Sequence, residues 1–301
     1  MSYQFELNQS NRALRFPVML MAAIVSMVIA AYVFAACGDR NPDQARASEP
    51  ATVTSSSASV TPVSDVHTET PALVVSGPVT FEMADSAYRD RRYDDATTLF
   101  KAYTENRPSN AWGFYMLGLS AWKSGDRGQA VSAFTQALGL DSTHAKSHLN
   151  LSRVLLEEGQ PDSALTHIEA AIVLDSTSSE PVRLQGRAFE AQGKMDDAIL
   201  AYQRAIHLDS TDVWSLNNLG ALYIRLERFQ EAIEPLKVAV QLNDKVAVFH
   251  NNLGMALERT GQYRVAEDEY RAAVGIEGTY GKAVTNLQRV QQLKEVTVPQ
   301  Q

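Results

Sequence analysis

One tetrapeptide, Leu-Asp-Ser-Thr, recurs at a fixed interval along this chain. It occupies residues 140–143, 174–177 and 208–211, so that consecutive copies lie 34 residues apart. A constant period of this length is typical of helical repeat arrays, in which each repeat buries its apolar face against its neighbours. The sequence therefore predicts a stack of similar helical units and not a globular enzyme.

Extending the interval in both directions gives six units, which are 77–110, 111–144, 145–178, 179–212, 213–246 and 247–280. An alanine recurs at one position of every unit: Ala96, Ala130, Ala164, Ala198, Ala232 and Ala266. A large side chain follows four residues later: Phe100, Phe134, Ile168, Tyr202, Leu236 and Tyr270. Residues four apart share one face of a helix. We infer that the alanine lets two helices approach and that the large residue fills the space between repeats.

The second unit carries a recognisable set of small residues. Leu117-Gly118 is followed by Ala121, and Gly125 stands where the first helix must end. This pattern resembles the tetratricopeptide repeat (TPR) family. The resemblance implies an all-α, right-handed superhelical solenoid of helix-turn-helix repeats. The pattern begins again after residue 280, which predicts a capping helix over 281–295 and a short tail over 296–301.

Two features mark the turns. Glycines recur at the predicted end of the first helix, where a left-handed residue closes the helix (Gly125, Gly159, Gly193 and Gly261). The fifth unit has Glu227 there, which leaves room for a different turn. We expect the Asp-Ser-Thr stretches to cap the following helix by accepting hydrogen bonds from its first amides.

Residues 1–36 have the layout of a signal peptide or a membrane anchor. Residues 16–36 carry no charge, and the only cysteine of the chain, Cys37, follows them. Phe34-Ala35-Ala36-Cys37 resembles a bacterial lipobox, which implies cleavage before Cys37 and lipidation of its thiol. The alternative is an uncleaved membrane helix, because 21 apolar residues would reach about 31 Å.

Both interpretations give the same topology. Arg12 and Arg15 precede the apolar segment and are not balanced by nearby acids. Positive flanks stay in the cytoplasm, which predicts that everything after residue 37 lies outside it, in the bacterial cell envelope. Residues 37–76 are rich in Ser, Thr and Pro and lack helical periodicity, and we interpret them as a disordered tether.

The composition argues against several functions. A formal net charge of −8 argues against a nucleic-acid partner. A single cysteine allows neither an intrachain disulfide nor a cysteine-based zinc site. The sequence has no phosphate-binding loop and no catalytic motif. It therefore predicts neither an enzyme nor a cofactor. His148 and His250 occupy the same position of their units, which indicates packing.

An asparagine recurs at one position of the predicted first helices. Its members are Asn150, Asn218, Asn252 and Asn286. The column resembles the asparagine ladder of some TPR proteins, which implies that the amides bind the backbone of a peptide ligand by donating and accepting together. The alternative is that these asparagines cap helices or are simply solvated.

Arginine and tryptophan form further columns. The arginines are Arg153 and Arg187 at one position and Arg225 and Arg259 at another; the tryptophans are Trp112 and Trp214. The arginines could bind carboxylates of a partner, or they could be solvated beside glutamates of the same face. The tryptophans could be binding hot spots, or they could pack against the neighbouring repeat.

Two hypotheses follow. The first is a membrane-tethered, extracytoplasmic scaffold or adaptor that binds a peptide or protein partner on its concave face. The second is a structural envelope protein that self-associates or docks on a large complex by its convex face.

Overall fold

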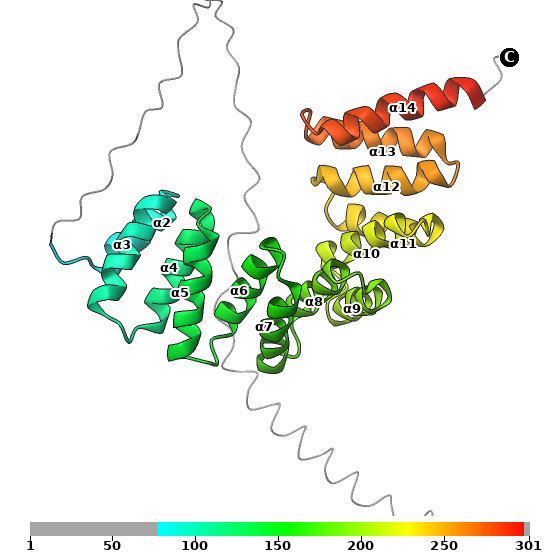
Figure 1. Cartoon of the computed structure of the whole chain (residues 1–301). Helices are drawn as coiled ribbons and strands as arrows, with labels where there is room; N and C mark the ends of the chain where they lie inside the picture. Colours follow the sequence, from blue (N-terminus) through cyan, green and yellow to red (C-terminus); the bar gives the residue numbers. More distant parts are fainter. Residues whose placement is uncertain (1–76, 298–301) are drawn as a thin grey trace, which may run out of the picture. The chain divides into compact units, whose positions relative to one another are not determined.

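The computed structural model describes residues 77–297, which fold into thirteen α-helices without a strand in this part of the chain (Figure 1). The predicted leader, the tether and Cys37 lie outside the described residues. The helices are α2 (Phe81–Arg89), α3 (Tyr93–Asn106), α4 (Ala111–Ser124), α5 (Arg127–Leu140), α6 (Ala145–Glu157), α7 (Pro161–Leu174), α8 (Ser179–Ala191), α9 (Met195–Leu208), α10 (Val213–Arg225), α11 (Phe229–Leu242), α12 (Ala247–Arg259), α13 (Tyr263–Ile276) and α14 (Gly281–Thr297). The predicted all-α repeat fold is thus confirmed.

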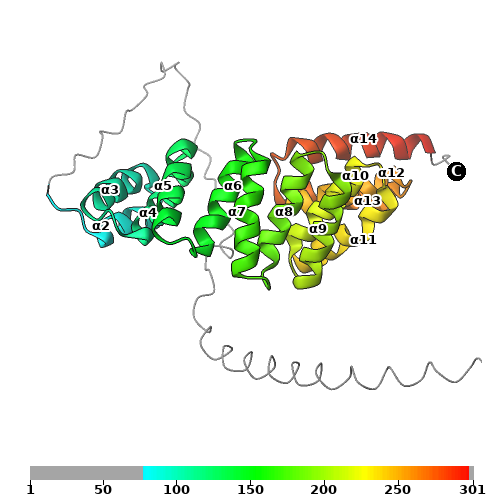
Figure 2. The same cartoon turned by 60° about the horizontal axis from the view of Figure 1, so that its bottom comes forward.

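The helices pack in consecutive pairs. We call the first helix of each pair the A helix (α2, α4, α6, α8, α10 and α12, with α14 beginning a further unit) and the second the B helix (α3, α5, α7, α9, α11 and α13). Each helix packs on the next in chain order (Figures 1 and 2). A helices also contact the A helix of the next repeat, as α10 contacts α12 and α12 contacts α14. Side chains that point away from the B helices form the A-helix face, which extends across α4, α6 and α8 and across α10, α12 and α14.

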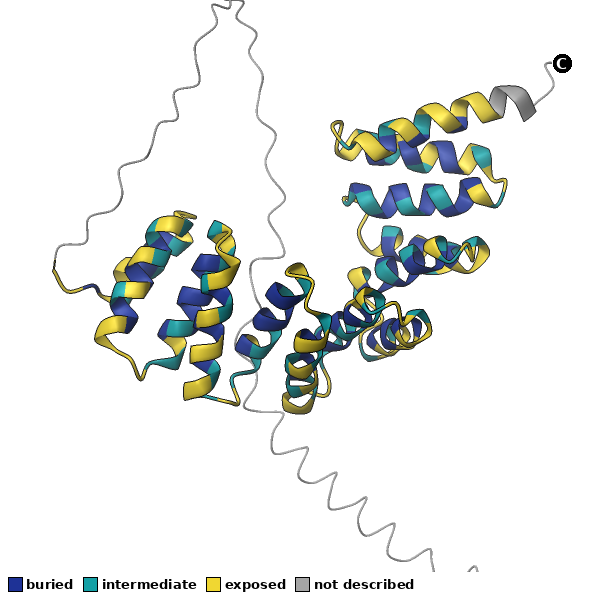
Figure 3. Cartoon of the chain, viewed as in Figure 1, coloured by how far each residue is buried: buried dark blue, intermediate teal, exposed yellow. Residues whose placement is uncertain are grey.

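In the second, fourth, fifth and sixth units, a glycine of the A helix lies directly against a large side chain of the B helix. A Cβ atom on Gly118 would lie 2.6 Å from the Phe134 ring, and one on Gly254 would lie 2.7 Å from the Tyr270 ring. Both rings are fully buried. Figure 3 shows buried residues (dark blue) along the helix sides that face other helices. Every alanine of the repeated column is also fully buried. This agrees with the predicted position of the alanines between the two helices of a pair.

The turns between A and B helices share one backbone conformation. Gly125, Gly159, Gly193 and Gly261 have φ between 71° and 94°. Glu227 adopts φ 59° at the equivalent position, so the fifth unit makes the same left-handed turn without a glycine. Arg91 does so in the first unit, with φ 61°. A left-handed conformation crowds the Cβ of these two residues against the backbone.

The expected role of the Asp-Ser-Thr stretches is wrong in its detail. Oδ1 of Asp141 accepts hydrogen bonds from the amide (2.9 Å) and the hydroxyl (2.7 Å) of Thr143, within the turn itself. Asp175 and Asp209 bond their threonines in the same way. The N-cap of the next helix comes after the tetrapeptide; it is His144 for α6. An aspartate two residues before an amide closes a local turn more readily than it reaches the helix.

Replacing Gly118 by alanine should destabilise the protein by about 1–3 kcal/mol through overpacking against Phe134. Gly139→Ala in the same repeat is the matched control, because nothing lies within 4 Å of a Cβ there. Alanine favours a helix over glycine by up to about 1 kcal/mol, so the control should be neutral or stabilising. Urea unfolding followed by circular dichroism measures both. Equal effects of the two substitutions would contradict the packing role of Gly118.

Glu227→Gly should stabilise the protein by roughly 0.5–1 kcal/mol, because the left-handed penalty exceeds the extra entropy that glycine loses on folding. Glu227→Ala removes the same carboxylate but keeps the Cβ, and it should give no such gain. The midpoints of urea unfolding compare the two variants. A gain of equal size in both would assign the effect to the charge and not to the backbone.

Candidate functional site

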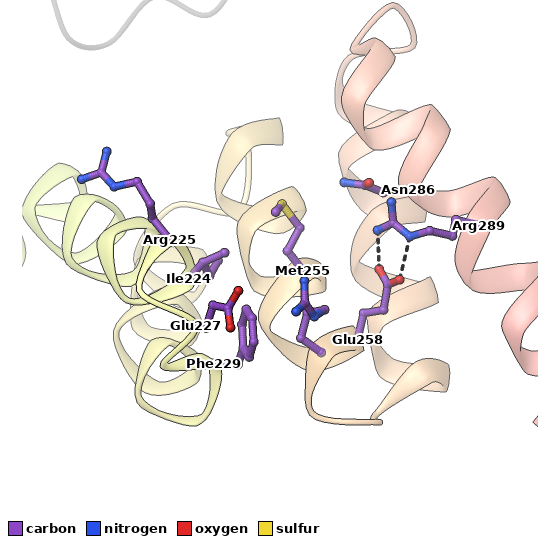
Figure 4. A pocket seen from close by; sticks show the side chains of 9 residues that line it. Ile224, Arg225, Glu227, Phe229, Met255, Glu258, Asn286 and Arg289 are labelled. Carbon is purple, nitrogen blue, oxygen red and sulfur yellow. Dashed lines mark hydrogen bonds and ion pairs between the residues drawn. The ribbon is translucent and has the colours of Figure 1, made fainter.

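Two adjoining hollows lie on the A-helix face of α10, α12 and α14. One has a volume of about 420 Å³ and the other about 620 Å³. Met255 and Asn286 line both, so that the two hollows adjoin, and we call them together the C-terminal groove. The first is lined by Ile224, Arg225, Glu227, Phe229, Met255, Glu258, Arg259, Asn286 and Arg289 (Figure 4). The second is lined by Val248, Asn251, Asn252, Met255, Tyr280, Gly281, Lys282, Thr285 and Asn286.

Helical spacing places these side chains together. On α12, Asn252, Met255 and Arg259 are three and four residues apart and therefore lie on one face. On α14, Lys282 and Asn286 follow the same spacing. Because α12 and α14 belong to successive units, the two rows run side by side along the groove.

An apolar surface lies beside an exposed guanidinium in the first hollow. The Arg259 guanidinium carbon stands 4.3 Å from the centroid of the Phe229 ring, and Ile224 and Met255 are half-buried nearby. No ion pair of Arg259 occurs among the described residues. A stacked arginine keeps its hydrogen-bonding edge free for a ligand. Sequence reasoning included Arg259 but missed Phe229 and Met255, whose sequence neighbourhood carries no distinguishing signal.

A buried carboxylate closes one side of this hollow. Glu258 accepts hydrogen bonds from Nε (2.8 Å) and Nη2 (2.7 Å) of Arg289 and from the hydroxyl of Tyr270 (2.6 Å); Figure 4 shows the pairing with Arg289. Burial alone would raise the pKa of Glu258, but these hydrogen bonds outweigh it and hold the pKa below its usual value. Glu258 and Arg289 thus neutralise each other, whereas Arg259 and the carboxylate of Glu227 line the same hollow without an ion pair among the described residues.

The four predicted asparagines have different surroundings. Asn150 and Asn286 are buried, whereas Asn218 and Asn252 are half-buried. Asn252 donates to the amide oxygen of Asn217 at 2.9 Å, and Asn286 donates to that of Asn251 at 2.9 Å. A ladder therefore exists between repeats, but each step joins residues of two neighbouring columns.

Asn150 makes the corresponding step to the hydroxyl of Tyr115 at 3.3 Å. Asn218 has no side-chain hydrogen bond within residues 77–297. Asn218 and Asn252 are thus the two more exposed asparagines of the column on the A-helix face. Of these, Asn252 lies in the C-terminal groove.

The four predicted arginines divide into paired and unpaired groups. Arg153 pairs with Glu180 and donates to Asn150 at 2.7 Å. Arg225 pairs with Glu190 at 2.5 Å. Arg187 and Arg259 are exposed and form no ion pair in the described part of the chain. Arg225 and Arg259 line the groove, and Arg153 and Arg187 lie on earlier repeats.

Each predicted tryptophan has one packed side and one exposed side. Trp112 is 44% exposed, with its ring centroid 5.0 Å from that of Tyr115. Trp214 is 43% exposed, with its ring centroid 5.1 Å from that of Phe249. Both interpretations of these residues thus retain support, and neither tryptophan lines the C-terminal groove.

Metal-ligand clusters and membrane spans are both missing from the described part of the chain. Within residues 77–297, no group of three or more His, Cys, Asp or Glu side chains could hold a metal ion. None of the described helices combines the length and the apolar character needed to cross a bilayer. The predicted lipidation site Cys37 lies outside these residues.

Solved structures with the same architecture come from several sources. PilF of Pseudomonas aeruginosa is 20% identical, with a TM-score of 0.56 over 62% of this chain and 84% of that chain. MamA of Desulfovibrio magneticus RS-1, from residue 41 to its end, is 22% identical, with a TM-score of 0.51 over 54% of this chain and 92% of that chain. TTC0263, a thermophilic TPR protein of Thermus thermophilus, is 16% identical, with a TM-score of 0.52 over 61% of this chain and 100% of that chain. At these identities the likeness concerns the fold.

Family models give the sequence relationship. Tetratricopeptide repeat models match residues 115–181, 213–246 and 247–280, and a TPR repeat model matches residues 186–227. No curated protein matches the sequence. The matched repeats support a scaffold for protein–protein interaction. The chain belongs to the tetratricopeptide repeat family.

Proposed function

We propose that this protein is a membrane-tethered adaptor that holds an extended segment of a partner protein along its A-helix face, in the C-terminal groove. The observation that carries the proposal is that two neighbouring hollows share Met255 and Asn286 in their linings. Combined volumes of this order suit several residues of an extended chain and not a single side chain. The side-chain amides of Asn252 and Asn286 and the guanidinium of Arg259 line the groove.

The groove offers three kinds of contact. The Asn252 amide uses one N–H for Asn217 and keeps donor and acceptor capacity for a peptide backbone. Arg259 is available for a carboxylate of the partner. Phe229 and Met255 provide an apolar surface for a neighbouring side chain. Backbone contacts hold a segment in register, and the other two contacts would select its sequence.

The proposed location follows from the N-terminal sequence alone. The apolar segment 16–36 and Cys37 would anchor the chain in a bacterial membrane, and the positive residues before them would keep the repeats outside the cytoplasm. Residues 37–76 would then separate the repeats from the membrane surface. With about 40 flexible residues, the root-mean-square separation would be roughly 35 Å.

The second candidate function is docking through the B helices. A hollow of about 320 Å³ lies between α3, α4 and α5, with Phe114 and Leu117 among its lining residues. Val173 on α7 and Leu200 on α9 are 84% and 64% exposed. Exposed apolar residues on this side favour a contact with a second copy or a large complex.

Site-specific photo-crosslinking distinguishes the two candidates. A photoreactive residue at Met255, in the groove, should capture a partner in cells, whereas one at Val265 on α13 should not. Val265 is 47% exposed on a B helix and outside the groove, so it reports on contacts of the B-helix side. Capture from position 265 alone would favour docking through the B helices.

Removing the groove contacts should abolish that capture. Combining Asn252→Ala with Arg259→Ala should reduce the crosslink from position 255 at least tenfold, because two polar contacts contribute about 1.5–3 kcal/mol in total. Arg264→Ala on α13 is the matched control, since it removes an exposed arginine outside the groove. An undiminished crosslink in the double variant would exclude these two side chains from the binding site.

Anchoring has a separate test. Cys37→Ser should abolish labelling by radioactive palmitate and leave an uncleaved precursor, because the serine hydroxyl does not replace the thiol in lipoprotein maturation. Electrophoretic mobility and membrane fractionation measure the outcome. Unchanged mobility together with membrane attachment would establish an uncleaved membrane helix.

A further inference from the structure

Two repeats carry the same unusual polar arrangement between their helices. In the third unit, His148 on α6 faces His167 on α7, with 3.0 Å between their Nδ1 atoms. In the sixth unit, His250 on α12 faces Glu269 on α13, with 2.7 Å between Nδ1 and Oε2. Both pairs are separated by 19 residues, and His250 lies three 34-residue periods after His148.

The second, fourth and fifth units fill these positions with apolar residues. The corresponding pairs are Phe114 with Ala133, Val182 with Ala201, and Leu216 with Pro235. A histidine on the A helix thus occurs only together with a polar residue on the B helix. Polar side chains at a half-buried helix interface need each other as hydrogen-bond partners.

Each A-helix histidine also holds the loop that enters its repeat. Nε2 of His148 lies 3.1 Å from the carbonyl oxygen of Ser142, and Nε2 of His250 lies 3.0 Å from that of Asp244. A carbonyl oxygen only accepts, so that Nε2 carries the proton in both histidines. Each imidazole therefore connects the loop before the A helix to the B helix of the same repeat.

The hydrogen bonds of the two pairs require different protonation states of the A-helix histidine and its partner. Nδ1 of His250 must also carry a proton to donate to the Glu269 carboxylate, which makes His250 an imidazolium. Between His148 and His167 there is room for one bridging proton only. If both rings are charged, two N–H groups point at each other and the connection between the rings is lost.

We propose that His148 and His167 form a pH-sensitive joint, which opens the third repeat when acid adds a second proton between the two rings, while the equivalent joint of the sixth repeat stays closed. Opening would release the Ser142 loop and the contact between α6 and α7. The array would then loosen in its middle and keep the C-terminal groove intact.

No nearby acid compensates a second charge on the pair. The elements that pack against α6 and α7 include α4, α5 and α8. Their acids, and those of α6, α7 and the junction loop, are engaged elsewhere or exposed: Asp141 with Thr143, Glu157 and Glu158 with Arg127, Asp162 with Gln192, Glu180 with Arg153 and Arg183, Glu190 with Arg225, and Glu169 at the surface. His144 and Lys146, at the start of α6, add positive charge when ionised.

The direction of the pH dependence follows from the pKa shifts. Burial lowers the pKa of His167, and the charge of His148 lowers it further. The unfolded chain then binds a proton more readily, so stability falls as the pH drops below the ordinary histidine value of about 6.5. The hydrogen bond to Glu269 raises the pKa of His250 despite partial burial. Its contribution is present at low pH and is lost as the pH rises through that raised value.

Hydrogen exchange of the full-length protein tests the proposal. After correction for intrinsic exchange, opening of α6 and α7 should increase roughly three- to tenfold between pH 7.5 and pH 5.0, while α12 and α13 should not open further. His167→Glu transfers the sixth-repeat pairing to the third repeat and should abolish the increase. An unchanged increase in this variant, or none in the unmodified protein, would overturn the proposal.

A second variant protects the test against a folding defect. Combining His148→Val with His167→Ala reproduces the apolar pair of the fourth unit, Val182 and Ala201, and should fold with a pH-independent third repeat. His144 remains in both variants, and burial lowers its pKa in the same direction. If the acid-induced opening persists in the double variant, it belongs to His144 and the joint is excluded.

Discussion

In four of the six repeats, a glycine of the A helix (Gly118, Gly186, Gly220 or Gly254) contacts a large side chain of the following B helix, and this contact determines the geometry on which the rest of the array depends. At Gly118 and Gly254 the ring of the B helix occupies the space of a side chain, which brings the two helix backbones together. The same rings are fully buried and form the centre of the two large apolar clusters, one in each half of the array. Once this distance is fixed, repeats can stack with their A helices side by side, as α10, α12 and α14 do, and an A-helix face results.

Polar contacts between repeats depend on that stacking. Asn252 reaches Asn217, Asn286 reaches Asn251, and Arg225 reaches Glu190, each across 35 residues. The step exceeds the 34-residue period by one, a displacement by which the partner is not the equivalent residue of the neighbouring repeat. This displacement explains why a column of asparagines in the sequence becomes a diagonal ladder in the structure. The hydrogen bonds of this ladder also occupy amide groups that a ligand would otherwise bind. Asn218 and Asn252 keep hydrogen-bond donors and acceptors for a ligand.

Most of the fold could be predicted, and part of the candidate site. The spacing of Ala130 and Phe134 predicts two packed helices, and the structure has them. Because Glu227 replaces the glycine of the other repeats, the sequence did not predict the conformation of the fifth turn. The turn is nevertheless the same as the others. The surrounding helix pair holds the backbone of Glu227 in the left-handed region, at an energetic cost that the sequence does not display. In the groove, Arg259 and Asn252 were found by their columns. Phe229 and Met255 were not, since their importance comes from lying beside Arg259 and Asn286 across two repeats.

The sequence by itself determined the period, the helix pairs and the positions where small residues are required, because these depend on interactions within one or two repeats. In the sequence, the pairing of His148 with His167 and of His250 with Glu269 is indicated only by the shared position of the two A-helix histidines. Only the tertiary structure decided which arginines are neutralised and which remain free, as Arg225 and Arg259 occupy the same column yet only Arg225 meets a glutamate. Charges and amides are satisfied by whichever neighbour lies within about 3 Å. That neighbour is set by the displacement between stacked repeats, which a one-dimensional pattern does not contain.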